Sequence, residues 1–177
     1  MFIRTVSSDA EIQAAVVSLS VDEVVIEVAA DIIVSATLSI EDVTTYLRST
    51  TGDNFVLSAN SQQILSVASS MVIISNITFM HGWTSSGGGC IYTYDTAVSL
   101  HGVNFMNCTA ALNGGGLFVD SGSSLIIDSN FTDCEAGNDG GGVSFWDATA
   151  RVYDTSFTRC YGVKSGGGLR VTYGSVY

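Results

Sequence analysis

The sequence contains no proline, and its charged residues make up only 13% of the chain. Lys164 is the single lysine, five arginines complete the basic set, and the net charge is −11. A nucleic-acid ligand needs a basic face and an anionic membrane surface attracts basic segments, so this balance argues against both partners. No uncharged apolar run approaches the roughly 20 residues that span a bilayer, so we expect no transmembrane segment. Residues 1–11 lack the basic and apolar regions of a signal peptide.

The residues that are present favour an all-β protein. Hydrophobic residues form 46% of the chain, and the 19 glycines are spread through turn-like clusters. Short runs rich in Val, Ile, Thr and aromatic residues lie between these clusters, which is typical of strands. The length of 177 residues fits one domain.

A repeating pattern dominates the second half of the chain. Glycine triplets begin at Gly87, Gly114, Gly140 and Gly166. Phenylalanines follow one another at intervals of 26, at Phe79, Phe105, Phe131 and Phe157, and Cys108, Cys134 and Cys160 each come three residues after their phenylalanine. Such a period predicts a solenoid in which like residues lie about 4.8 Å apart in successive coils. Strand alternation then sends Cys90 and Tyr92 inward and Ile91 outward.

The first part of the chain predicts an N-terminal cap and two irregular coils. Ser8 and Glu11 form a capping box, and Ile12, Ala15, Val16 and Leu19 follow at helical spacing, so a short amphipathic helix should cover the first coil. Seven β-like runs come next, at residues 24–28, 32–34, 37–40, 45–47, 55–57, 64–67 and 71–74. We predict one domain over residues 1–177: a cap (1–23), irregular coils (24–76) and regular coils of the repeat (77–177). The last coil ends without a polar cap, so we expect an excerpt of a longer chain.

The repeat unit, Phe-x-x-Cys followed by Gly-Gly-Gly and an apolar residue, resembles a known family. It is similar to the Phe-x-x-Asn and Gly-Gly-Ala-Ile repeats of the polymorphic outer-membrane proteins of chlamydiae, within the pectin-lyase-like superfamily. Cysteine stands here where that family has asparagine. The resemblance covers residues 77–169 and implies a right-handed parallel β-helix used in adhesion or as a structural rod, with no catalytic residue to carry over.

The cysteines admit three interpretations. The spacing of 26, without CxxC or a nearby histidine pair, does not supply the four convergent ligands of a metal site. A disulfide between adjacent parallel strands is awkward, although about 5 Å between Cα atoms permits one. We expect buried, unpaired thiols that act as small hydrophobes, with one bridge as the main alternative and a metal site as the lesser one.

Three sequons mark Asn76, Asn107 and Asn130 as candidate glycosylation sites, if the protein passes through a eukaryotic secretory pathway.

Asp128 and Asp154 share one position in successive coils, where they could hold a cation such as Ca²⁺ or act as solvated turn residues. We expect turn residues, and the sequence indicates no other cofactor. Asp133 and Arg159 should form an ion pair between coils.

Four apolar residues in outward columns suggest a partner surface: Ile91, Phe118, Leu125 and Ile127. Alternatively, loops from outside this sequence could cover these residues.

The evidence for a catalytic site is weaker than that for a partner surface. Asp120 and Asp147 follow successive glycine triplets and Arg170 lies on the next coil, which permits a shallow acidic site. Neither His81 nor His101 has a carboxylate to orient it.

Two functions remain open at this point. The first is a non-catalytic extracellular or cell-surface β-helix segment, a glycoprotein that meets protein or glycan partners in adhesion or a larger assembly. The second is a carbohydrate-active β-helix enzyme, a polysaccharide lyase, hydrolase or epimerase, with a shallow acidic site. A flat apolar face would favour the first, and clustered carboxylates in a groove would favour the second.

Overall fold

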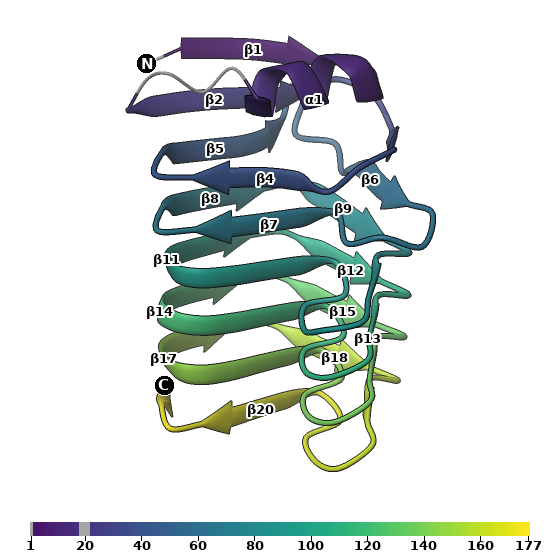
Figure 1. Cartoon of the computed structure of the whole chain (residues 1–177), viewed down its shortest axis with the longest axis vertical. Helices are drawn as coiled ribbons and strands as arrows, with labels where there is room; N and C mark the ends of the chain where they lie inside the picture. The colour runs from purple at the N-terminus through teal and green to yellow at the C-terminus, as the bar shows by residue number, and fades with distance from the viewer. Residues whose placement is uncertain (1, 18–21) are drawn as a thin grey trace.

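The computed structural model describes residues 2–17 and 22–177, and its architecture is all-β. Parallel strands form a β-solenoid of about six turns, with one short helix in the described part of the chain. Figure 1 shows the coils stacked along the long axis, with the N-terminus at one end and the C-terminus at the other. The predicted fold class is confirmed. Leu19, which we expected in the helix, lies outside the described residues.

Three parallel sheets make up the walls of the solenoid. The largest sheet stacks β1 (Phe2–Val6), β2 (Glu23–Val28), β5 (Thr44–Ser49), β8 (Met71–Ser75), β11 (Ile91–His101), β14 (Leu117–Ile127), β17 (Val143–Tyr153) and β20 (Leu169–Thr172) in that order. Joined to it are β4 (Leu38–Glu41), β7 (Leu65–Ala68) and β21 (Ser175–Val176). The second sheet comprises β3 (Ile32–Val34), β6 (Phe55–Ala59), β9 (Ile77–Met80), β12 (Asn104–Met106), β15 (Asn130–Thr132) and β18 (Ser156–Thr158). The third comprises β10 (Trp83–Thr84), β13 (Thr109–Ala110), β16 (Glu135–Ala136) and β19 (Tyr161–Gly162).

The phenylalanine column lies in register through the core, as the period predicts. Phe105 pairs with Phe79 on one side and with Phe131 on the other, and Phe131 pairs with Phe157. Their rings stack with centroids 5.5, 4.4 and 5.1 Å apart. Phe79, Phe105 and Phe131 are fully buried. Since burial stabilises by roughly 25 cal/mol per Å² of apolar surface, this column is a main source of stability.

The corners of each coil use left-handed backbone. In one coil, φ is 63° at Gly114, 65° at Ser121, 50° at Asp128 and 53° at Asp133. A side chain at Gly114 would collide with the Leu117 carbonyl, so only glycine fits there. Asp and Asn tolerate left-handed backbone better than other side chains do, which explains their frequency at the remaining corners.

The register differs from the expectation at the first glycine triplet. Ile91 pairs with Leu117 and Tyr92 pairs with Phe118, so Cys90 occupies the place that Gly116 takes one coil later. The first triplet is therefore displaced by one position from the other three. Ile91 is fully buried and Tyr92 lies half-buried on the outer face, so the expected orientations of both residues were wrong.

The strands of the first coils stack in register although the connections between them vary in length. Each of the seven runs expected there overlaps a strand, although Thr37 and Ile64 lie just before the strands that their runs enter. Val24 pairs with Thr45, and Thr45 in turn pairs with Val72, so the second of these two coils is the longer one. This variation hides the period from sequence inspection.

Helix α1 (Asp9–Val17) caps the N-terminal end of the solenoid (Figure 1). Its buried residues are Ile12, Ala15 and Val16, which face the first coil. The Ser8 Oγ accepts a hydrogen bond from the Glu11 amide at 3.4 Å, as in a capping box, whereas the Glu11 carboxylate accepts from the Ser7 amide at 2.7 Å. The strand β1, which pairs in parallel with β2, was not predicted.

The phenylalanine column provides a test of the core. We expect Phe131→Ala to lower the free energy of unfolding by about 3–5 kcal/mol, because it leaves a cavity between two stacked rings. Urea titration followed by circular dichroism measures this change. Tyr153→Ala, which removes an exposed ring from the neighbouring large sheet, should change stability by no more than about 0.5 kcal/mol. Equal losses in the two variants would contradict the assignment of Phe131 to the core.

A candidate binding face of aromatic and acidic side chains

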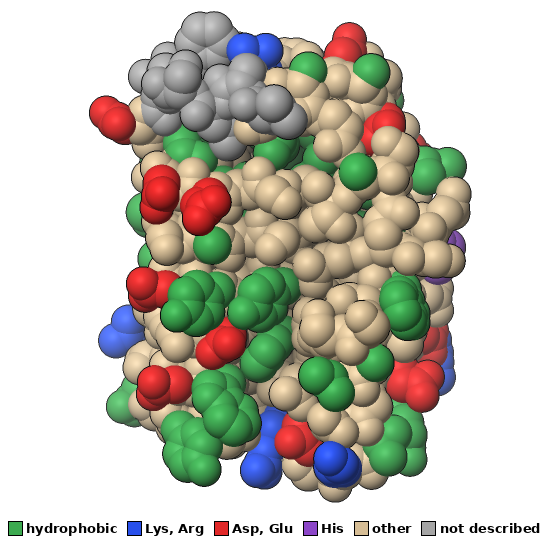
Figure 2. Space-filling view, in the orientation of Figure 1, with side chains coloured by type: hydrophobic (Ala, Val, Ile, Leu, Met, Phe, Trp, Pro, Cys, Tyr) green, Lys and Arg blue, Asp and Glu red, His purple; other side chains and the backbone are tan. Residues whose placement is uncertain are grey.

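Aromatic side chains gather on the outer face of the large sheet, over the first halves of β11, β14 and β17 and over β20. Tyr94, Trp146 and Tyr173 are 49%, 43% and 77% exposed. Strand alternation positions Tyr94 and Trp146, because the neighbouring Thr93 and Phe145 point into the core and are fully buried. Tyr173 follows the end of β20, at a corner with φ of 56°. Figure 2 shows hydrophobic side chains on the lower left of this face, with acidic side chains between them.

The rings pack against one another along the stacking direction. The centroid of Tyr92 lies 5.7 Å from that of Phe118, and the indole of Trp146 meets the ring of Tyr173 edge-on at 5.2 Å. Aromatic pairs in such geometries stabilise beyond the area they bury. The exposed rings therefore form pre-positioned platforms.

Three carboxylates border these rings. Asp120 lies in register between Tyr94 and Trp146, and its Oδ2 accepts a hydrogen bond from the Tyr92 hydroxyl at 3.4 Å. Burial, together with the Asp120 charge, raises the pKa of Tyr92. Asp95 and Asp147 occupy the exposed corner that follows, with φ of 47° and 48°. We call the whole set the aromatic–acidic face: Tyr92, Tyr94, Asp95, Phe118, Asp120, Trp146, Asp147 and Tyr173.

The two candidate catalytic carboxylates thus lie on one face, in neighbouring columns. Asp120 is in register with Trp146, and Asp147 is the next residue along β17. Arg170 is in register with Ser144, and its Nε is buried without a hydrogen-bond partner among the described residues. His81 lies exposed at a corner, and His101 contacts the Ser99 hydroxyl through Nε2 at 3.0 Å.

The candidate cation pair occupies a corner. Asp128 and Asp154 follow the paired Ile127 and Tyr153, with φ of 50° and 47°. Corner conformation alone explains aspartate at these positions. Over residues 2–17 and 22–177, no group of three or more His, Cys, Asp or Glu side chains is arranged to hold a metal ion.

The three sequons lie on different surfaces. Asn107 is exposed at a corner with φ of 52°, and Asn76 is half-buried at another. Asn130 is exposed on β15, where its Nδ2 donates to Asn104 Oδ1 at 3.0 Å and its Oδ1 accepts from Ser156 Oγ at 2.6 Å. Glycosylation at the three asparagines stays a prediction.

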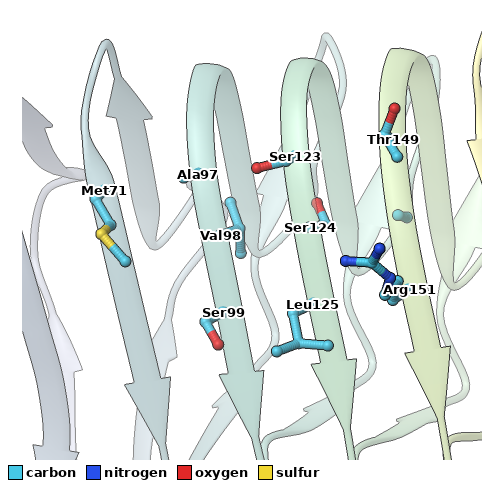
Figure 3. Close-up of a pocket in the computed structure, with 10 residues that line it drawn as sticks. Met71, Ala97, Val98, Ser99, Ser123, Ser124, Leu125, Thr149 and Arg151 are labelled. Atoms are coloured by element: carbon cyan, nitrogen blue, oxygen red, sulfur yellow. The ribbon is translucent and has the colours of Figure 1, made fainter.

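The remaining partner-surface candidates are half-buried. Phe118 packs on Tyr92, and Ile127 lies between His101 and Tyr153 in its column. Leu125 lines a shallow depression of about 260 Å³ together with Met71 and Arg151. Figure 3 shows that these side chains come from neighbouring rungs of the large sheet, with serines between them.

The predicted ion pair between coils is confirmed. Arg159 donates from Nε and Nη2 to the two carboxylate oxygens of Asp133, at 2.6 Å each. The guanidinium lowers the pKa of Asp133, and the carboxylate raises the pKa of Arg159. Both side chains reach solvent, so the pair contributes little to stability. Sequence reasoning missed a second pair, Arg48 with Glu27 at 2.7 Å.

One disulfide corrects the expectation for the cysteines. Cys90 and Cys108 are bonded, with an S–S distance of 2.04 Å and a Cα–Cα distance of 5.4 Å. Cys134 is a buried free thiol, as expected, whereas Cys160 is free but only partly buried. The bridge was missed because Cys90 was placed in the wrong column: it takes the third-glycine position, beside Cys108.

Comparisons with protein-family models, with curated proteins and with solved structures find no match for this chain. Within residues 2–17 and 22–177, no helix has the length and apolar character to cross a membrane.

The disulfide assignment is open to chemical mapping. We expect denatured, unreduced protein to take up alkylating reagent at Cys134 and Cys160 alone, with Cys90 and Cys108 labelled only after reduction. Peptide mass spectrometry identifies each site. Labelling of Cys90 or Cys108 without reductant would contradict the bridge.

The sequons predict a glycan that depends on the secretory route. Secretion from eukaryotic cells should add a glycan at Asn107, since that side chain is exposed and sits in Asn-Cys-Thr. Thr109→Ala should remove this glycan and lower the mass accordingly. A mass unchanged by glycosidase treatment of the secreted wild type would contradict the prediction.

Proposed function

We propose that this chain is a non-catalytic segment of an extracellular or cell-surface β-solenoid that serves adhesion or structural assembly. The aromatic–acidic face is its contact surface in this proposal. The observation that carries it is the exposure of Tyr94, Trp146 and Tyr173 on one face of the large sheet. Exposed apolar patches of this kind commonly mark contacts with a partner.

The sheet makes the platform rigid. Each of these strands pairs with neighbours in adjacent coils through parallel hydrogen bonds. Inward residues such as Phe145 are locked in the core, so the neighbouring ring of Trp146 is held outward. A ligand therefore meets rings that lose little conformational freedom on binding, which favours affinity.

The chemistry of the face favours a hydroxyl-rich or cationic ligand. Carboxylates accept hydrogen bonds from hydroxyl and ammonium groups, while aromatic rings offer stacking surfaces and attract cations. Tyr94 and Trp146 occupy one column two coils apart, a separation of roughly 10 Å. An extended neutral or amino-sugar chain that runs along the solenoid could contact both rings. An anionic polymer would instead be repelled by the carboxylates of Asp95, Asp120 and Asp147.

Two further observations support an extracellular setting. The Cys90–Cys108 disulfide is typical of oxidising compartments, and the sequon residues Asn107 and Asn130 are exposed. The resemblance of the repeat to that of the polymorphic outer-membrane proteins also favours adhesion at a cell surface.

The second candidate function is a carbohydrate-active enzyme. It is favoured by the juxtaposition of Asp120 and Asp147 on one face, since such enzymes use paired carboxylates. Against it, Asp120 accepts a hydrogen bond from Tyr92, and Asp147 stands exposed at a corner. A general acid usually sits in a buried, apolar setting, whereas Asp120 is only half-buried and Asp147 is exposed.

The two tryptophans allow a matched test of the binding face. Trp146 is 43% exposed on the aromatic–acidic face and Trp83 is 45% exposed on the third sheet. In affinity electrophoresis, gels containing hydroxyethylcellulose or glycol chitosan should retard the wild-type protein. Trp146→Ala should weaken binding roughly fivefold to tenfold, as expected for loss of one aromatic contact, while Trp83→Ala should bind like the wild type.

Polygalacturonate serves as the discriminating polymer in the same assay. We expect neither retardation nor cleavage, because the face is acidic. Equal weakening by the two tryptophan variants, or no retardation by either uncharged or cationic polymer, would overturn the proposed face. Release of cleavage products by the wild type but not by Asp120→Ala would favour the enzyme instead.

A further inference from the structure

The cysteines form a column along the interior of the solenoid. Cys108, Cys134 and Cys160 each follow a corner residue and hold the same position in successive coils. Residues stacked in this way have Cα atoms about 4.8 Å apart, which lies within the range that disulfides span. Each sulfur atom is therefore close to its neighbour in the column.

The disulfide removes only one member of this column. Cys108 is bonded to Cys90, which occupies the third-glycine position of its coil. Gly116 and Gly142 hold that position in the next two coils, so Cys134 and Cys160 have no such lateral partner. A side chain at Gly142 would lie 2.6 Å from both the Gly168 oxygen and the Phe157 ring, so no cysteine fits there. The thiol that remains available to Cys160 is that of Cys134.

The two thiols differ in accessibility. Cys134 is fully buried, whereas Cys160 is partly exposed on the coil that follows. The Cys160 Sγ lies 3.3 Å from the carbonyl oxygen of Phe131, and the Cys134 Sγ lies 3.7 Å from that of Phe105. A reagent from solvent can reach Cys160 first, and Cys134 only through it.

The interaction between the neighbouring thiols makes them chemically unequal. The Cys134 thiol lowers the pKa of Cys160 to about 7. Its interaction with Cys160, together with burial, raises the pKa of Cys134. The thiolate is the nucleophile in disulfide exchange, so the exposed member of the pair is also the reactive one near neutral pH.

We propose that Cys160 and Cys134 form a reactive thiol site, in which Cys160 attacks a small-molecule disulfide such as oxidised glutathione and Cys134 resolves the product. In the first step the Cys160 thiolate bonds to one glutathione sulfur, the glutathione S–S bond breaks, and one glutathione thiolate leaves. In the second step Cys134 gives its proton to solvent, its thiolate attacks the Cys160 sulfur, and the second glutathione leaves as a thiolate. The thiol pair is oxidised by two electrons and the small disulfide is reduced by the same two.

Exchange within the column is the competing outcome. Cys134 also lies in register beside Cys108, so its thiolate could attack the Cys90–Cys108 bond instead. The exposure of Cys160 and the burial of Cys134 favour entry at Cys160. A product with Cys134 bonded to Cys160 and with Cys90 still bonded to Cys108 distinguishes the proposal from shuffling.

The test uses the intact chain, with its native disulfide, and oxidised glutathione at pH 7.4. Quenched samples are digested and mapped by mass spectrometry. The wild type should form a Cys134–Cys160 link and release two glutathione thiols per chain. Cys134→Ala should instead accumulate a stable glutathione adduct on Cys160, and Cys160→Ser should remain unmodified while folded. Circular dichroism checks that each variant keeps the wild-type fold.

A second readout needs no variant. The rate at which iodoacetamide alkylates Cys160 in the folded wild type should rise with pH around a midpoint of about 7. A midpoint at or above the ordinary thiol value of 9.0 would overturn the proposal. So would a Cys108–Cys134 link as the main product, or equal modification of wild type and Cys160→Ser.

Discussion

Parallel, in-register stacking of one coil on the next is the constraint on which the whole molecule depends. A rise of about 4.8 Å per coil brings each residue directly beside its counterpart one repeat away. In the core this stacks the rings of Phe79, Phe105, Phe131 and Phe157. On the outer wall it spaces aromatic rings along a column, and near the second sheet it aligns the thiols. Core, face and thiol site are three consequences of one geometry.

The sequence predicted most of the fold because the period is carried by residues with strong individual requirements. Phenylalanine must be buried and glycine must turn, so their spacing indicated the coil length. The first glycine triplet led to a wrong alignment of its coil with the next one. In the structure, residues 87–89 match residues 113–115, and Cys90 matches Gly116. Counting one phenylalanine interval back from Leu117, in place of aligning the triplets, would have paired it with Ile91. The same count would have predicted that Tyr92 stacks on Phe118.

The candidate face could not be predicted in the same way. Tyr94, Asp120 and Trp146 hold the same position in successive coils but differ in residue type. The sequence therefore shows no repeating residue at this position. These side chains are exposed because their neighbours along the strand point into the core. Only the strand register shows which residues point inward. The aspartates were harder still to interpret. Asp128, Asp147 and Asp154 all lie at left-handed corners, a backbone conformation that aspartate tolerates. Charge at a corner of this solenoid is weak evidence for a site.

Selective NMR of the phenylalanine rings tests the stacking most directly. With only phenylalanine protonated in a deuterated chain, the account predicts ring-to-ring NOEs that connect Phe79 to Phe105, Phe105 to Phe131, and Phe131 to Phe157, in keeping with centroid separations of 5.5, 4.4 and 5.1 Å. Phe→Leu variants assign each ring. Absence of these contacts, or an NOE that joins Phe79 directly to Phe157, would contradict the stacked coil.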